Sequence, residues 1–219
     1  GYLVIDNALN TEEVNEIRNA FNDTFRKLNN VKHIEVGLLE YDKRFLKLLD
    51  NEPVIKKIKT ILGNCIQLHS ATARLCKPGE SNQIWHRDGP WPVDPAGTPF
   101  GSIPGQVNCG YYLDELNSEN GAFALVPGSH KVKFDIPRED FEYPDQKYLF
   151  AKPGQAILFS GWMYHRGMGN RSKSDRRVCL MCYQNAWIKS REDFDGPIAN
   201  EIRNNGNDEQ KLLLGGADK

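Results

Sequence analysis

The chain has 219 residues, of which 39% are hydrophobic, and a formal net charge of −1. This length provides one sizeable core and is short for two, so a single domain over residues 1–219 is expected. The near-neutral charge argues against a nucleic-acid partner, because phosphate recognition requires a basic face, and no apolar stretch is long enough to span a bilayer, so no membrane partner is expected. Composition does not indicate an oligomeric state.

The five cysteines are odd in number and too sparse for a secreted protein held by disulfides. A reducing, cytoplasmic compartment is therefore expected, although the chain opens at Gly1 and a targeting segment ahead of it is left open. Cys179 and Cys182 have Cys-x-x-Cys spacing. Because residues three apart on a strand face opposite sides, we expect two unrelated packing cysteines.

Residues 1–64 are expected to form a helical N-terminal part. A first helix can start at a cap on Asn10 or Thr11, and a second can start at Asp50 or Asn51 and stop at Gly63. The apolar positions of both helices recur at spacings of three and four, which predicts one core-facing side for each. These positions are Val14, Ile17, Phe21, Phe25 and Leu28 in the first helix and Val54, Ile55, Ile58, Ile61 and Leu62 in the second.

Residues 65–190 change in texture to short strand-like runs separated by Gly, Pro, Asn and Asp. The runs cover residues 66–76, 107–113, 122–126, 155–159 and 178–188. Helices followed by many short strands predict an α+β domain with an antiparallel double sheet. Residues 191–219 remain as a C-terminal extension.

His86 and Asp88 are one residue apart, and His165 follows a predicted buried strand. Residues i and i+2 of an extended chain project to the same side, so His86 and Asp88 can hold one ion while Arg87 points away. Two imidazoles and one carboxylate on one face of an octahedral Fe(II) leave positions open for an organic co-substrate and O2. The three residues are therefore the candidate metal ligands and catalytic centre.

A basic pair, Arg176 and Arg177, opens the apolar run that follows His165. A guanidinium beside the metal is suited to a carboxylate, which it can hold with two parallel hydrogen bonds. From the residues alone either arginine could serve. Arg166, next to His165, is expected to be a surface group or to lie behind the site, as is Arg87.

The ligand pair in the run Trp85-His86-Arg87-Asp88, the stretch over residues 119–131 with its Asn-Gly turn, and His165 followed by Asn170 and Arg176 together resemble the phytanoyl-CoA dioxygenase family. The opening residues 1–6, leading into an amphipathic helix, are similar to the family's first strand and helix. The resemblance implies a double-stranded β-helix, a jelly-roll barrel with the metal in its mouth. It also implies Fe(II) held by His86, Asp88 and His165, and Arg176 on the distal carboxylate of the co-substrate 2-oxoglutarate.

By this resemblance the chain is a dioxygenase that hydroxylates a small-molecule metabolite at a C–H bond with O2, releasing succinate and CO2. The sequence departs from the family at two positions near the co-substrate. Gly167 stands where many relatives have serine, and Gly110 where relatives often have tryptophan. Gln83, Asn108 and Tyr112 are accordingly only candidates for further 2-oxoglutarate contacts. Asp88 itself favours hydroxylation over halogenation, because related halogenases have a small residue in that place.

Residues 89–106 are rich in Pro and Gly, and we interpret them as a lid over the iron. Trp91, Asp94 and Phe100 are its candidate substrate contacts, with a surface excursion as the other interpretation. Arg74, on the run before the ligand pair, could bind an anionic substrate if it faces the pocket. The remaining histidines, His33, His69 and His130, are expected to be structural or solvated.

Two alternatives remain open. The same oxidant could be used for desaturation or cyclisation in natural-product biosynthesis, since the outcome depends on where the substrate radical sits. A non-catalytic metal-binding jelly roll is the other, with Gly110 and Gly167 marking a decayed co-substrate pocket.

Overall fold

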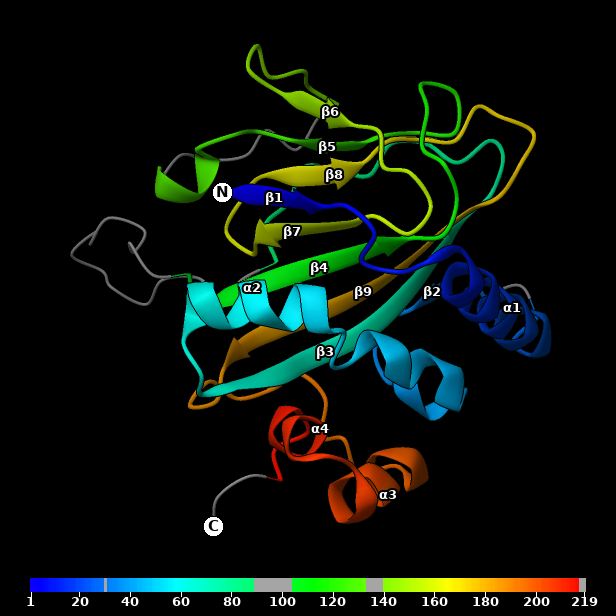
Figure 1. Cartoon of the computed structure of the whole chain (residues 1–219). Coiled ribbons are helices and arrows are strands. Elements are labelled where there is room, and N and C mark those ends of the chain that lie inside the picture. Colours follow the sequence, from blue (N-terminus) through cyan, green and yellow to red (C-terminus); the bar gives the residue numbers. More distant parts are fainter. Residues whose placement is uncertain (30, 89–103, 133–139, 217–219) are drawn as a thin grey trace.

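Two helices form where the apolar spacing predicts them in the computed structural model, which describes all residues except 30, 89–103, 133–139 and 217–219 (Figure 1). Helix α1 (Thr11–Lys27) begins after Asn10, whose side chain accepts a hydrogen bond from the backbone N–H of Glu13 while Glu13 accepts one from the N–H of Asn10. Helix α2 (Glu52–Leu62) ends at Gly63, whose φ of 87° favours glycine.

The apolar stripe of α2 is narrower than predicted. Val54, Ile55, Ile58 and Leu62 are buried, whereas Ile61 is 39% exposed. At 100° per residue Ile61 lies at the edge of this stripe, beyond the part that the sheet covers. The placement of Ile61 on the buried side was therefore wrong.

Every strand pairing is antiparallel. The larger sheet has the order β1-β7-β4-β9-β3-β2 and the smaller has the order β6-β5-β8. The strands of the larger sheet are β1 (Tyr2–Ile5), β2 (His33–Ile34), β3 (Ile66–Cys76), β4 (Gln106–Tyr112), β7 (Ala156–Ser160) and β9 (Arg176–Asn185). Those of the smaller sheet are β5 (Phe123–Leu125), β6 (Lys147–Leu149) and β8 (His165–Gly167). The prediction of a mixed fold with antiparallel sheets is confirmed.

The central strands β4 and β7 of the larger sheet are buried on both faces. One face packs on α1, α2 and the 3₁₀ helices Leu38–Glu40 and Lys43–Leu48 through residues such as Cys109 and Leu158. The other face meets the smaller sheet through residues such as Ile157 and Phe159 (Figure 1). Because alternate residues of one strand point to opposite faces and both faces of β7 are covered, β7 has apolar residues at its first four positions, 156–159.

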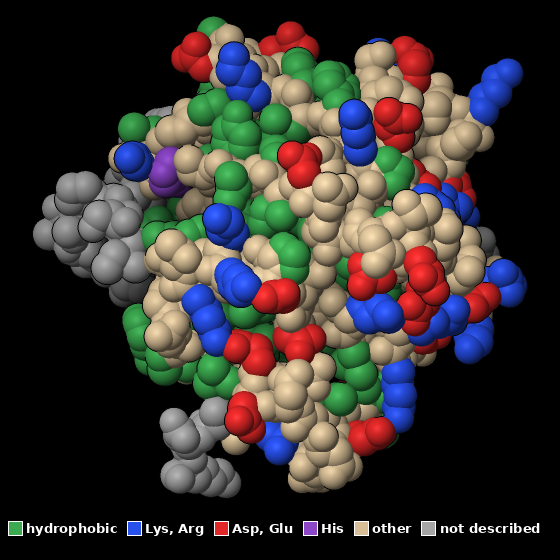
Figure 2. Space-filling view, viewed as in Figure 1, with side chains coloured by type: hydrophobic (Ala, Val, Ile, Leu, Met, Phe, Trp, Pro, Cys, Tyr) green, Lys and Arg blue, Asp and Glu red, His purple; other side chains and the backbone are tan. Residues whose placement is uncertain are grey.

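The C-terminal extension adds helices α3 (Pro197–Asn205) and α4 (Asp208–Leu213), and a 3₁₀ turn, Ser129–Lys131, follows β5. The first turn of α3 is held by Glu40, whose carboxylate accepts from the backbone N–H groups of Ile198 (2.9 Å) and Ala199 (2.7 Å). Among the described residues, none of the helices carries an apolar stretch that could cross a bilayer. Acidic and basic side chains are interspersed on the face shown in Figure 2.

Candidate functional site

A short extended segment brings His86 next to β8. The backbone N–H and C=O of His86 pair with those of His165 in both directions at 3.1 Å, while the N–H of Asp88 donates to the carbonyl of Gly161 at 2.8 Å. The pairing is a single bridge and not a regular strand. Alternation still holds, because His86 and Asp88 face one side and Arg87 faces the other.

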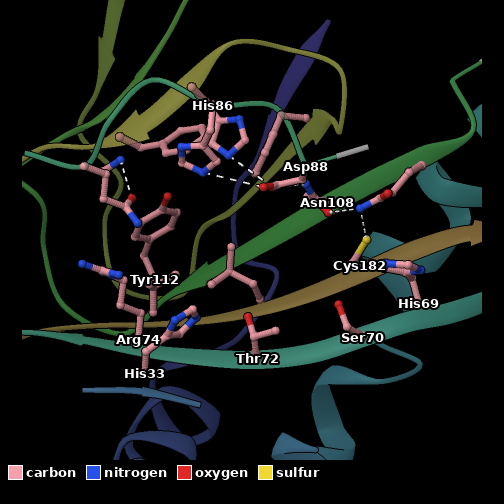
Figure 3. A pocket seen from close by; sticks show the side chains of 18 of the residues that line it. His33, His69, Ser70, Thr72, Arg74, His86, Asp88, Asn108, Tyr112 and Cys182 are labelled. Atoms are coloured by element: carbon pink, nitrogen blue, oxygen red, sulfur yellow. Dashed lines mark hydrogen bonds and ion pairs between the residues drawn. The ribbon is translucent and has the colours of Figure 1, made fainter. Parts of the chain in front are cut away.

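The three predicted metal ligands converge, although His165 is distant in sequence. One ligand atom from each of His86, Asp88 and His165 lies within 4.8 Å of the others. His86 Nε2 is 3.6 Å from Asp88 Oδ1, and His165 Nε2 is 3.2 Å from Asp88 Oδ2 (Figure 3). His165 is 4% exposed, whereas the Asp88 side chain is 35% exposed, so the cluster lies at the edge of a buried region.

Both imidazoles are oriented by their own backbone. Nδ1 of His86 lies 2.8 Å from the carbonyl oxygen of Ile84, and Nδ1 of His165 lies 2.9 Å from that of Met163. An N–H on Nδ1 that donates to a carbonyl turns Nε2 towards the cluster, where its lone pair can bind a metal once Nε2 carries no proton. The two rings thus present the atom that a metal ion requires.

The three side chains of the cluster shift one another's pKa values. Desolvation raises the pKa of the Asp88 carboxyl, but the charges of His165 and His86 and the hydrogen bonds from His165 and Asn108 outweigh it and hold the pKa at about 2. Burial lowers the pKa of His165, but the charge and hydrogen bond of Asp88 raise it above the usual histidine value. Burial and the neighbouring His165 lower the pKa of His86. Asp88 is consequently ionised and His86 neutral at physiological pH.

Asn108, predicted as a 2-oxoglutarate contact, instead faces Asp88. Its Nδ2 donates to Asp88 Oδ2 at 2.8 Å, and its Oδ1 accepts from Gln106 Nε2 at 3.3 Å. Gln106 Nε2 also lies 2.6 Å from Cys182 Sγ. These hydrogen bonds fix which end of the Asn108 amide faces the carboxylate of Asp88. Neither Gln106 nor Cys182 was predicted from the sequence as part of the site. Cys179, by contrast, lies in the core against the helices, so the two cysteines do face opposite sides.

Arg176 lines the same cavity and is anchored on one side. Its Nη1 donates to the carbonyl oxygens of Asn120 (2.9 Å), Gly121 (2.7 Å) and Met168 (2.8 Å). A Cβ at position 121 would lie 2.3 Å from Nη1, and the φ of Gly121 is +91°, so this turn requires glycine. These bonds fix the guanidinium while its Nη2 lies towards Gly167.

The neighbouring arginines point elsewhere. Arg177 pairs with Asp114 at 3.1 Å and donates to Asn22 of α1 at 2.8 Å, outside the cavity. The Arg87 guanidinium lies over the Tyr164 ring at 3.8 Å from its centroid. Arg166 was expected behind the site or on the surface; it is 1% exposed, pairs with Asp140 and lies over the ring of Trp85 at 4.6 Å. The expected surface placement was therefore wrong. The ring of Trp85 and the carboxylate of Asp140 take the place of the water that would otherwise hydrate the guanidinium of Arg166.

Both unusual glycines are covered by a neighbouring side chain. Gln83 Oε1 accepts from the N–H of Gly167 at 2.8 Å, and a Cβ on residue 167 would lie 2.7 Å from that oxygen. The ring of Tyr112 lies over Gly110, where a Cβ would be 3.2 Å from the ring. Gln83 and Tyr112 therefore occupy the space that a larger residue at 167 or 110 would need, and both line the cavity.

The cavity has a volume of about 420 Å³ and a floor made of three neighbouring strands. Strand register places Arg74, Val178 and Tyr112 in one row, with Ser70, Cys182 and Asn108 in another. The row between them consists of Thr72, Leu180 and Gly110. Arg176 precedes the first row on β9, and Asn108 in the last row contacts Asp88, so the two charged ends of the cavity are separated along the strands.

Most of the residues with which β2 and β3 line the cavity were not predicted from the sequence. His33, His69, Ser70 and Thr72 line the cavity together with Arg74 (Figure 3). His33 and His69 were expected to be structural or solvated; both line this space, and His33 is exposed. Trp91, Asp94 and Phe100, and most of the proposed lid over residues 89–106, lie outside the described residues.

The chain is similar to several known proteins. Dioxygenase hkm4 of Aspergillus hancockii is 41% identical over 105 residues, which cover 46% of this chain and 32% of that protein. The matched part thus spans about a third of that relative's length. Among solved structures, HygX of Streptomyces hygroscopicus with nickel and 2-oxoglutarate bound has a TM-score of 0.74 at 18% identity, covering 88% of this chain and 85% of HygX.

The non-heme alpha ketoglutarate dependent epimerase SnoN from nogalamycin biosynthesis has a TM-score of 0.69 at 16% identity, covering 85% of this chain and 77% of SnoN. These likenesses show a shared fold. The family profile described as Phytanoyl-CoA dioxygenase (PhyH) matches residues 1–178, which include His86, Asp88, His165 and Arg176. The chain belongs to the phytanoyl-CoA dioxygenase family.

Proposed function

We propose that this chain is an Fe(II)- and 2-oxoglutarate-dependent dioxygenase that hydroxylates a small-molecule metabolite at a C–H bond and releases succinate and CO2. The observation that carries the proposal is the convergence of two imidazole Nε2 atoms and one carboxylate on a cavity that Arg176 also lines. We also propose that the two sheets form the double-stranded β-helix of the family, with this site at its open end.

The donor set fits Fe(II). His86, His165 and Asp88 offer two neutral nitrogens and one anionic oxygen, the ligand type of non-haem iron oxygenases. The amide of Asn108 holds Oδ2 of Asp88, which leaves Oδ1 on the side of His86. When bound, iron and 2-oxoglutarate would activate O2, with oxidation of 2-oxoglutarate to succinate and CO2, for removal of a hydrogen atom from the substrate and return of a hydroxyl group.

Arg176 fits the distal carboxylate of 2-oxoglutarate. Three backbone carbonyls hold one edge of its guanidinium and position the charge before any ligand arrives. The amide of Gln83, whose oxygen is engaged by Gly167, can direct its nitrogen to the same carboxylate. Burial raises the pKa of Tyr112, so its hydroxyl stays protonated as a donor into the cavity. The contribution of these residues is to bind, to orient and to exclude water.

Hydroxylation, desaturation and cyclisation share the same metal ligands, so the product depends on the substrate's position. The apolar side chains of Phe123 and Phe159 stand beside His165, with ring centroids 5.5 and 4.6 Å from its imidazole, and form a wall without groups for acid–base chemistry.

The test starts from metal-free protein loaded anaerobically with Fe(II) and 2-oxoglutarate. We expect a metal-to-ligand charge-transfer absorbance under nitrogen and succinate formation after exposure to air, with more succinate when a substrate is present. Binding of iron without either signal would instead support a non-catalytic metal-binding module.

A further inference from the structure

The cavity has more positive charge than its catalytic parts use. Three arginines line it, namely Arg74, Arg176 and Arg191, and among the described lining residues Asp88 is the only carboxylate. Under the proposed function, Fe(II) with Asp88 carries one net positive charge. Adding Arg176 and doubly charged 2-oxoglutarate brings these four groups to neutrality.

The two other arginines differ in their partners. Arg191 forms an ion pair of 3.0 Å with Glu35. Arg74 lies 3.6 Å from Glu80, a longer contact, and Glu80 is shared with Lys32 at 3.2 Å. Two cations, Lys32 and Arg74, therefore share one carboxylate, and this group carries one net positive charge.

Of these two cations, Arg74 is the one that lines the cavity. Its Nε is enclosed and has no hydrogen-bond partner among the described residues, and its side chain is 27% exposed. Arg74 pairs in register with His33 of β2, which also lines the cavity. An enclosed cationic donor without an acceptor is unfavourable until an anion supplies one.

Strand β3 continues from Arg74 towards the metal ligands with small polar side chains. Thr72 and Ser70 share the inward face of Arg74, and Ser70 stands in the row of Asn108, which contacts Asp88. Arg74 and Ser70 are four residues apart, about 13 Å at roughly 3.3 Å per residue. Figure 3 shows these side chains across the cavity from His86 and Asp88.

We infer that the substrate is a small monocarboxylate whose carboxylate is held by Arg74, with hydroxyl or amino groups facing Thr72 and Ser70 and the reacting carbon several bonds from the carboxylate. This inference rests on the proposed function and deepens it by naming the substrate class. The cavity volume of about 420 Å³ must hold the co-substrate as well as the substrate, which fits a small molecule.

The experiment compares short hydroxy- and amino-carboxylic acids with their primary amides, and with phosphate monoesters of the same length. Each is added to the iron-loaded enzyme with 2-oxoglutarate and air, and succinate is measured. We expect at least one acid to raise succinate formation above the basal rate while its amide does not. A phosphate ester that works better than the acid would overturn the carboxylate assignment, and an amide that works equally well would overturn the anion site.

Two variants separate the role of Arg74 from that of its salt bridge. Arg74→Gln should raise the half-saturating concentration of the active acid by about tenfold or more while the KM for 2-oxoglutarate changes by less than about twofold. Lys32→Gln removes the cation that competes for Glu80 and does not touch the cavity lining, so it should weaken the acid by less than Arg74→Gln does and leave the KM for 2-oxoglutarate unchanged. An unchanged acid dependence in Arg74→Gln, or no acid that stimulates a working enzyme, would count against the inference.

Failure of the proposed function gives a different result. If neither wild type nor variant forms succinate from 2-oxoglutarate, the dioxygenase assignment fails. Calorimetric titration of the same acids into nickel-loaded wild type and Arg74→Gln still decides the anion site, because weaker binding in the variant is expected whether or not turnover occurs.

Discussion

At the scale of single residues, His86 and His165 are oriented by the same local contact with the backbone. In His86 and in His165, Nδ1 faces the backbone carbonyl two positions earlier in the chain. This contact depends on the extended backbone on either side and needs no distant partner. Each imidazole is therefore set to offer Nε2 as soon as its segment adopts an extended conformation.

Replacing His86 tests the metal site with little damage to packing, because its side chain is 32% exposed. We expect His86→Ala to lose stoichiometric Fe(II) binding and turnover while its circular dichroism stays that of the wild type. His165→Ala should lose both as well, with some loss of stability because His165 is buried. Full iron content and activity in His86→Ala would contradict the assignment.

Metal affinity should depend on pH through His165. Its pKa is raised, mainly by Asp88 against the effect of burial, so a proton must leave Nε2 before the metal binds. Below that pKa we expect affinity to fall by about tenfold per pH unit, and above it to level off. His86, whose pKa is lowered, adds no proton in this range. Calorimetry with nickel in buffers of different ionisation enthalpy measures the release, and pH-independent affinity on the acid side would refute it.

Gly167 and Gln83 should behave as a coupled pair. A serine at 167 would place its Cβ 2.7 Å from Gln83 Oε1 and 3.3 Å from Arg176 Nη2. Gly167→Ser should therefore displace Gln83 and weaken 2-oxoglutarate binding by about tenfold, and Gln83→Ala in the same chain should recover part of the loss, because neighbouring residues couple by about 0.5–3 kcal/mol. Strictly additive effects in titrations of 2-oxoglutarate would show that the two positions do not share this space.

At the scale of elements, strand alternation assigns the two arginines of β9 to different sides. Arg176 faces inward with Val178 and Leu180 in the cavity lining, whereas Arg177 faces α1 and Asp114. Their adjacent positions leave no ambiguity once the register of β9 with β3 and β4 is known. The sequence alone left open whether Arg176 or Arg177 faces the cavity, and the register of this sheet decides it.

Arg176→Gln should weaken 2-oxoglutarate binding by about 2–5 kcal/mol, because it removes a buried charged partner of the distal carboxylate. Arg177→Gln is the matched control. It should cost some stability through Asp114 and Asn22, yet leave 2-oxoglutarate affinity nearly unchanged. Charge-transfer absorbance of the iron-loaded variants gives both affinities, and the reverse order would mean that Arg177 holds the co-substrate.

At the scale of the whole molecule, the site joins the two sheets. His165 belongs to β8 of the smaller sheet and His86 pairs with it, whereas Arg176 and the Asn108 that holds Asp88 belong to the larger sheet. A metal and a co-substrate bound between them connect elements that otherwise meet through the apolar layer around Phe159. Binding should therefore stabilise the fold as a whole.

Thermal unfolding should show two increments. Nickel should raise the Tm, and 2-oxoglutarate added to nickel-loaded protein should raise it again, since a ligand at 100 times its Kd contributes about 2.7 kcal/mol. Arg176→Gln should keep the first increment and lose most of the second at the same concentration. An undiminished second increment in this variant would place the co-substrate elsewhere.

The sequence by itself determined the parts of this protein that depend on local chemistry. Helices α1 and α2 follow from cap residues and from apolar spacing, and the pairing of His86 with Asp88 on one side follows from extended backbone. The direction of Arg87 follows from the same alternation. Each of these rests on interactions among residues a few positions apart, which periodicity reports directly.

Only the tertiary structure decided which faces meet. The register of β3 shifts between Leu68 and Ser70, and this irregularity brings His69 as well as Ser70 to the cavity. Strands β2 and β6 are too short to leave a periodic signal, and their pairing with β3 and β5 is what places them. Periodicity states which residues share a face, but partners distant in the chain decide whether that face meets solvent, core or substrate.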